Sequence, residues 1–212
     1  MRRQPHPPPV YAIADADALA PTPVASGVAR MAEAGLRWIQ VRAKSLSDRE
    51  LYDQLERCCR LLEGSDATLW VDDRADLAAL FPVAGVHVGQ RDLPPEAVRR
   101  VVGPGLWIGL STHNEVQLEA AERSPEVDLV ALGPIFSTGS KREPDPVVGL
   151  ERLRRARGKT FKPLVAIGGI DAQRVPEVLA AGADSVAVLA AVCRGDVVAN
   201  CRRLLESAEA CR

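Results

Sequence analysis

The chain has 212 residues, of which 47% are hydrophobic, a size that suits one sizeable hydrophobic core. Its 27 basic and 28 acidic residues nearly cancel, so the charge balance does not favour nucleic acid or a membrane surface as a partner. No apolar run approaches the roughly 20 residues that a membrane-spanning helix needs. We therefore expect a single-domain protein that holds any anionic ligand by local groups.

The N-terminal stretch MRRQPHPPPV has a proline run where a secretory signal needs an apolar core. It predicts a disordered lead over residues 1–9 of a cytoplasmic protein, followed by one domain over residues 10–212. Five cysteines have no CxxC spacing, so we expect reduced structural thiols; they are Cys58, Cys59, Cys193, Cys201 and Cys211.

From residue 10 onward, short apolar runs alternate with longer amphipathic segments. The predicted strands are 10–15, 38–42, 68–72, 85–89, 107–111, 129–133, 164–169 and 185–190. Their nearly continuous apolar character is typical of strands buried on both faces of a parallel sheet.

The segments between these strands carry helix signals. Ser47 and Glu50 fit a capping box, Asp171 can cap the segment after the seventh strand, and Pro94 and Pro95 suit a first helical turn. Eight β/α units without a long gap predict a (β/α)8 TIM barrel, with an open sheet of the same units as the alternative.

In such a barrel the active site lies at the carboxyl ends of the strands, and polar residues gather there in the sequence. Strands two to four are followed by cations and carboxylates, namely Arg42, Lys44, Asp72, Asp73 and Asp92. One interpretation is a ring of salt bridges at the barrel rim. The other is a diphosphate site, in which Asp73 and Asp92 bind Mg²⁺ while Arg42, Lys44 and Lys141 bind phosphate oxygens.

Three further features lie at the predicted mouth. The loop FSTGSKRE offers hydroxyl groups and a glycine, and Gly168 with Gly169 forms either a phosphate-binding turn or a tight strand exit. His113 follows the fifth strand, where it either transfers protons and contacts substrate or fills a simple polar role. His87 is expected to be packed inside the barrel.

Six motifs in register resemble the thiamin phosphate synthase family: QVRAK, VDDRADLA, GVHVGQRDLP, IGLSTH, LGPIFSTGSK and VAIGGI. The resemblance implies a transferase that joins 4-amino-5-hydroxymethyl-2-methylpyrimidine diphosphate to a thiazole phosphate, forming thiamin phosphate and releasing diphosphate. It implies small-molecule substrates, a Mg²⁺ cofactor held by Asp73 and Asp92, and a possible homo-oligomer.

The resemblance also assigns roles at the predicted site. The pyrimidine diphosphate would contact Gln40, Arg42, Lys44, Asp72, Ser111 and Lys141. The thiazole partner would face Thr138, Ser140, Gly168 and Gly169, and the substrate-binding set also includes Leu189 and Ala190. The catalytic set would be Arg42, Lys44, Ser111, His113 and Lys141.

Two positions depart from the family pattern. Asp72 stands where the family usually has Asn, and an ionised aspartate cannot donate a hydrogen bond to a pyrimidine nitrogen. Ala190 stands where the family usually has a Ser that binds the thiazole phosphate.

Two alternatives stay open. The first is the related thiazole tautomerase, which carries a functional histidine at the position of His113, although tautomerisation gives Arg42, Lys44 and the two carboxylates no task. The second is a non-catalytic barrel that binds thiazole phosphate or thiamin phosphate.

Overall fold

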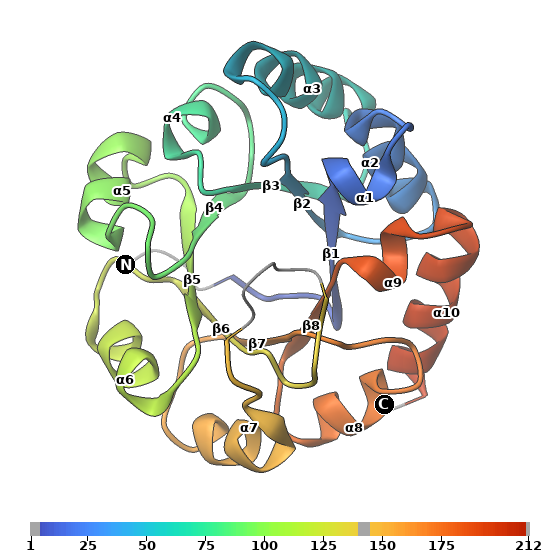
Figure 1. Ribbon diagram of the computed structural model, residues 1–212. Helices are drawn as coiled ribbons and strands as arrows, with labels where there is room; N and C mark the ends of the chain where they lie inside the picture. The colour runs from blue at the N-terminus through green and yellow to red at the C-terminus, as the bar shows by residue number, and fades with distance from the viewer. Residues whose placement is uncertain (1–4, 140–144, 211–212) are drawn as a thin grey trace.

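A computed structural model describes residues 5–139 and 145–210 of the chain. Eight strands form a closed barrel in the order β1 to β8, and each pairs in parallel with its neighbours, β8 with β1 included. Figure 1 looks down this barrel and shows the helices as an outer ring. The predicted (β/α)8 fold is confirmed, and the open sheet is excluded.

Every predicted strand is present and begins at the predicted residue. The strands are β1 Val10–Asp15, β2 Trp38–Arg42, β3 Thr68–Asp72, β4 Gly85–Val88, β5 Trp107–Thr112, β6 Leu129–Leu132, β7 Leu164–Ile167 and β8 Ser185–Val188. The predicted ends of β7 and β8 were each two residues too late, because the glycine turn and the start of a short helix follow there.

The described residues form helices of very different length. They are α1 Ala16–Leu19, α2 Val24–Glu33, α3 Asp48–Leu61, α4 Ala75–Ala78, α5 Pro95–Val102, α6 Glu115–Arg123, α7 Gly149–Arg157, α8 Val175–Ala180, α9 Ala190–Cys193 and α10 Val197–Glu209.

Two of the predicted helix-start signals are confirmed, and the third is displaced by one turn. Ser47 and Glu50 form the predicted capping box of α3, and Pro95 is the first residue of α5. Asp171 accepts a hydrogen bond from Arg174 N at 3.1 Å, so it caps the turn before α8 and not the helix itself.

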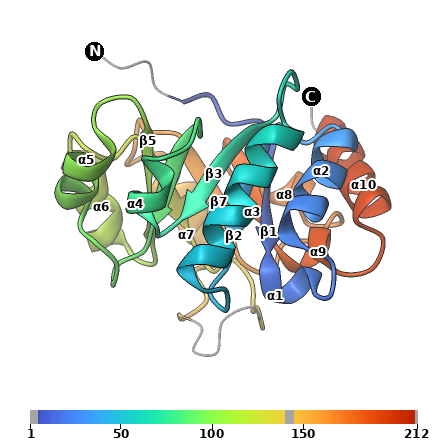
Figure 2. The ribbon, with the colours of Figure 1, turned by 90° about the horizontal axis from the view of Figure 1, so that it is seen from above.

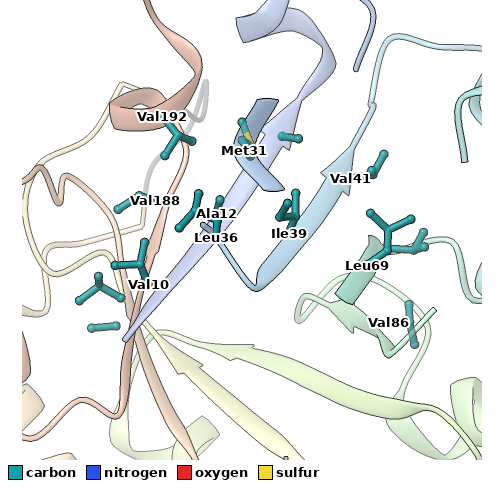
Figure 3. Close-up of a cluster of buried hydrophobic side chains, with 14 of the residues drawn as sticks. Val10, Ala12, Met31, Leu36, Ile39, Val41, Leu69, Val86, Val188 and Val192 are labelled. Atoms are coloured by element: carbon teal, nitrogen blue, oxygen red, sulfur yellow. The ribbon is translucent and has the colours of Figure 1, made fainter. Parts of the chain in front are cut away.

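The main hydrophobic core lies between the barrel wall and the helices. Figure 3 shows part of this layer, where Val10 and Ala12 of β1 lie near Met31 of α2 and Val192 of α9. Burial of this layer is the main favourable contribution to folding. The carboxyl ends of the strands lie outside this layer and can carry the polar residues of the site.

A second, smaller core fills the inside of the barrel. Tyr11, Trp38 and Trp70 have ring centroids 4.9 to 5.8 Å apart, and Trp107 stacks on Trp70 at 6.1 Å. Gly85 makes room for these rings, since a Cβ at this position would lie 2.6 Å from the Trp70 ring. The aromatic rings fill the barrel towards the amino ends of the strands.

The described part of the N-terminal lead, residues 5–9, has no regular secondary structure and crosses the end of the barrel where the strands begin (Figure 2). Pro9 O accepts a hydrogen bond from Val186 N at 2.9 Å, which joins the lead to β8. The predicted boundary between lead and domain stays a prediction. Within the described residues, no helix combines the length and apolar character needed to cross a bilayer.

Candidate active site

A cavity of about 190 Å³ opens at the carboxyl ends of the strands. Its polar lining comes from successive strand ends, with Gln40 and Arg42 on β2, Asp72 on β3, and Ser111 on β5. Aliphatic side chains of β1 and β7 line the inner part, among them Ile13, Val165 and Ile167. The cavity therefore combines a charged rim with an apolar interior, as small-molecule sites usually do.

A network of alternating charges forms one side of the rim. The Arg42 guanidinium pairs with Asp15, the last residue of β1, and lies 3.8 Å from Asp72 Oδ2. Lys44 Nζ lies 3.2 Å from the same Asp72 oxygen and also pairs with Asp73. Two cations thus stand beside three carboxylates at the mouth of the barrel.

The Asp72 carboxyl has a raised pKa. Its burial at the strand end raises the pKa, Lys44 and Arg42 lower it, and the charge of Asp92 raises it again. Burial is the largest of these effects and therefore sets the direction of the shift.

The two predicted metal ligands lie in loops after their strands. Asp73 has φ 58°, a left-handed conformation that aspartate tolerates better than most residues, and its N–H donates to His87 O at 2.8 Å. Asp92 is exposed and its Oδ2 accepts from Gly89 N at 2.8 Å. Among the described residues, no three His, Cys, Asp or Glu side chains form a group suited to a metal. Two carboxylates nevertheless fit Mg²⁺, which takes one or two of them together with water and substrate phosphates.

His87 and Ser111 form a hydrogen-bonded pair in the cavity wall. His87 Nε2 lies 2.9 Å from Ser111 Oγ, and the histidine is only 8% exposed. The prediction that His87 is packed inside the barrel is correct, but its ring also lines the cavity.

Gln40 and Tyr11 form a second buried pair. Gln40 Nε2 donates to the Tyr11 hydroxyl at 2.9 Å. Burial raises the pKa of Tyr11 well above its ordinary value, so the hydroxyl stays protonated. This bond fixes the orientation of the Gln40 amide in the cavity wall.

His113 lies between two oxygen atoms. Its Nδ1 lies 2.6 Å from Gly133 O and therefore donates to this carbonyl, while Nε2 lies 3.4 Å from Asp145 Oδ2. His113 and Asp145 both line the cavity.

The glycine turn closes the opposite side of the cavity. Gly168 and Gly169 have φ values of 102° and 66°, and a Cβ on Gly169 would lie 2.5 Å from Ser137 O. Only glycine fits this close approach of the chain after β7 to the chain after β6.

Comparison with known proteins identifies the family. Residues 10–192 match the family model of thiamine monophosphate synthase. The chain belongs to this family. A thiamine-phosphate synthase of Koribacter versatilis is 49% identical over 187 residues, which cover 86% of this chain and 88% of the relative. The motif resemblance is therefore confirmed.

Solved structures agree with this family membership. A thiamine phosphate pyrophosphorylase from Pyrococcus furiosus has 32% identity and a TM-score of 0.85, and the match covers 95% of this chain and 96% of that one. The tryptophan synthase α-subunit of the same organism reaches a TM-score of 0.72 at 14% identity, which shows a shared fold alone.

The cavity brings most of the predicted substrate-binding residues together. Its lining includes Gln40, Arg42, Asp72, Ser111, His113, Thr138, Gly168, Gly169, Leu189 and Ala190. Lys44, Asp73 and Asp92 lie outside the lining. Lys44 is connected to the lining by its ion pair with Asp72, and Asp73 pairs in turn with Lys44. Ser140 and Lys141 lie outside the described residues.

Sequence reasoning missed four polar residues of the site. Asp15 directly ends the first apolar run, so the strand-end rule applied to β1 would have found it. Tyr11 and His87 lie within apolar strands, and Asp145 lies in a loop, where no local pattern marks them. All but Asp15 line the cavity, and Asp15 orients Arg42.

Proposed function

We propose that this barrel joins 4-amino-5-hydroxymethyl-2-methylpyrimidine diphosphate to thiazole phosphate, releasing diphosphate and forming thiamin phosphate. Relatives named thiamine-phosphate synthase match most of the chain, which bears out the predicted transferase function. The observation that carries the proposal is the cavity itself, which has cations on one side and a glycine turn on the other.

The cationic side suits the diphosphate. Arg42 and Lys44 can each donate charge-assisted hydrogen bonds to diphosphate oxygens, and such bonds contribute about 1.5 to 3 kcal/mol. Their present partners, Asp15, Asp72 and Asp73, hold both cations at the mouth. Because charge builds up on the diphosphate as it leaves, these cations stabilise the transition state more than the ground state.

The apolar interior suits the pyrimidine. Departure of the diphosphate leaves a pyrimidinylmethyl cation, which the thiazole nitrogen then captures. The aliphatic wall of β1 and β7 keeps water from competing for this cation. Gln40 offers its amide to the ring, and the thiazole phosphate lies against the Gly168–Gly169 turn. No strong nucleophile is required of the chain.

Mg²⁺ is part of the proposal, with Asp73 and Asp92 as its ligands, and it would neutralise further charge on the departing diphosphate. The predicted homo-oligomeric state and cytoplasmic location stay predictions.

A thiazole tautomerase is the second candidate. The observation that favours it is His113, whose ring is fixed by Gly133 and Asp145 in the cavity wall and is suited to proton transfer. Tautomerisation, however, leaves the cation and carboxylate network without a role.

The deciding experiment mixes the purified chain with both substrates, with and without Mg²⁺, and detects thiamin phosphate by mass spectrometry. We expect a Mg²⁺-dependent product that is lost in Arg42→Gln and retained in the control Arg123→Gln, which alters an exposed pair on α6. Isomerisation of thiazole carboxylate phosphate without this product would favour the tautomerase. Ligand binding without either reaction would favour a non-catalytic barrel.

A further inference from the structure

The pair formed by His87 and Ser111 has a geometry that goes beyond packing. His87 lies within β4 and Ser111 near the end of β5, and both face the cavity. The 2.9 Å between His87 Nε2 and Ser111 Oγ is a normal hydrogen-bond length.

Gly109 holds the imidazole in this place. It is the register partner of His87 on β5, and a Cβ at this position would lie 2.3 Å from His87 Nδ1 and 3.1 Å from Cε1. The ring therefore lies against the β5 backbone and reaches forward to Ser111, two residues further along the same strand. A side chain at position 109 would push the ring away from Ser111.

The direction of this hydrogen bond determines what Ser111 can do. A hydroxyl has one proton to donate and two lone pairs to accept with. If Ser111 donated its proton to His87 Nε2, it would offer only lone pairs to the cavity, and these repel phosphate oxygens. If His87 Nε2–H donates, the Ser111 proton is available to an anion.

We propose that His87 is a positioning residue that donates from Nε2–H to Ser111 Oγ and thereby directs the Ser111 hydroxyl proton to an anionic oxygen of the substrate. The inference rests on the proposed diphosphate substrate. It does not depend on the charge of the ring, since the neutral Nε2–H tautomer and the imidazolium both carry this proton.

The first test measures the proton directly in the unmodified protein. The chain has three histidines, so ¹⁵N-histidine labelling gives few signals, and His6→Gln and His113→Gln variants assign them. We expect the NMR spectrum to show a protonated His87 Nε2, with a one-bond ¹H–¹⁵N correlation to its attached proton. An unprotonated Nε2 that accepts from Ser111 overturns the proposal.

The second test separates positioning from packing. His87→Leu fills the space without a donor, whereas His87→Gln keeps an amide N–H near the original Nε2. We expect His87→Leu and Ser111→Ala each to lower kcat/KM for the pyrimidine diphosphate about 10- to 100-fold, the loss of one hydrogen bond to a charged group. His87→Leu should cause no further loss in the Ser111→Ala background, and His87→Gln should recover most of the activity.

Independent, multiplicative losses in the double variant overturn the proposal, as does an activity of His87→Gln no better than that of His87→Leu. If His87→Leu does not fold, the labelled unmodified protein and His87→Gln still decide the matter. If the unmodified chain forms no thiamin phosphate, the proposed function fails, and the affinity for inorganic diphosphate then tests His87 separately. Equal affinity in the unmodified and His87→Leu proteins would overturn it.

Discussion

Replacing Asp15 with alanine tests the link between the first helix and the cationic rim. Asp15 Oδ1 accepts from Ala18 N at 2.9 Å as the N-cap of α1, and Oδ2 accepts from Arg42. The Asp15 side chain is 5% exposed, so water does not replace these partners. Loss of an N-cap costs about 1 kcal/mol and loss of a hydrogen bond to a charged group about 1.5 to 3 kcal/mol. We expect the free energy of unfolding to fall by about 3 kcal/mol.

The two contributions can be measured separately. Asp15→Asn keeps an N-cap oxygen and loses the carboxylate, so we expect it to lose about 2 kcal/mol. The matched control is Asp196→Asn, because Asp196 caps α10 by accepting hydrogen bonds from Val198 N and Ala199 N, and asparagine caps as well as aspartate.

The assay is urea denaturation of the three variants, with thermal melts in parallel. For a chain of this size, 3 kcal/mol lowers Tm by about 6 to 12 °C. Asp15→Asn should also raise KM for the pyrimidine diphosphate, since Arg42 loses the partner that orients it. The reasoning is refuted if Asp15→Asn is as stable as the unmodified protein, or if Asp196→Asn loses just as much.

Further predictions concern the metal pair, the α3 cap and the thiols. Asp92→Ala should abolish Mg²⁺-dependent turnover while thiazole phosphate binding, followed by calorimetry, stays nearly unchanged; equal loss of both would make Asp92 structural. Ser47→Ala should lower the free energy of unfolding by about 1 kcal/mol in urea melts. Hydrogen bonds from Ser47 lower the pKa of Glu50. The Glu50 carboxylate therefore stabilises the fold fully above its ordinary pKa, and this stabilisation is lost as the pH falls through the lowered value. A Ser47→Ala loss of stability that does not shrink in acid would contradict this. Burial raises the pKa of three thiols to about 11 or 12, so peptide mapping should find them unalkylated by iodoacetamide in the folded protein near neutral pH, and rapid modification would show that they are accessible; they are Cys58, Cys193 and Cys201.

The fold could be predicted because parallel strands buried on both faces leave an unmistakable apolar pattern. Every strand begins where its apolar run begins, from Val10 to Ser185. The site could be predicted in part for a related reason. Strand ends meet at one rim, so residues such as Arg42, Asp72 and Ser111 come together however the connecting loops run.

The same apolar pattern hides other residues of the site. In a strand buried on both faces, alternation does not show which side chains point into the barrel, so nothing marked Tyr11 and His87 as cavity residues. Asp145 meets His113 only because of the path that the chain takes after β6, and no local pattern encodes that path. The loop positions of Asp73 and Asp92 likewise depend on tertiary structure.

The aromatic core of the barrel gives the protein an intrinsic fluorescent probe. Trp38, Trp70 and Trp107 are the three tryptophans of the chain, and their ring centroids lie 4.9 to 6.2 Å apart. Tyr11 touches both this cluster and the cavity, with its ring 5.5 Å from Trp38. The indole emission therefore comes from one cluster inside the barrel, which Tyr11 connects to the cavity. Substrate titrations need no label, and a change in fluorescence reports on the barrel interior and not on distant surfaces.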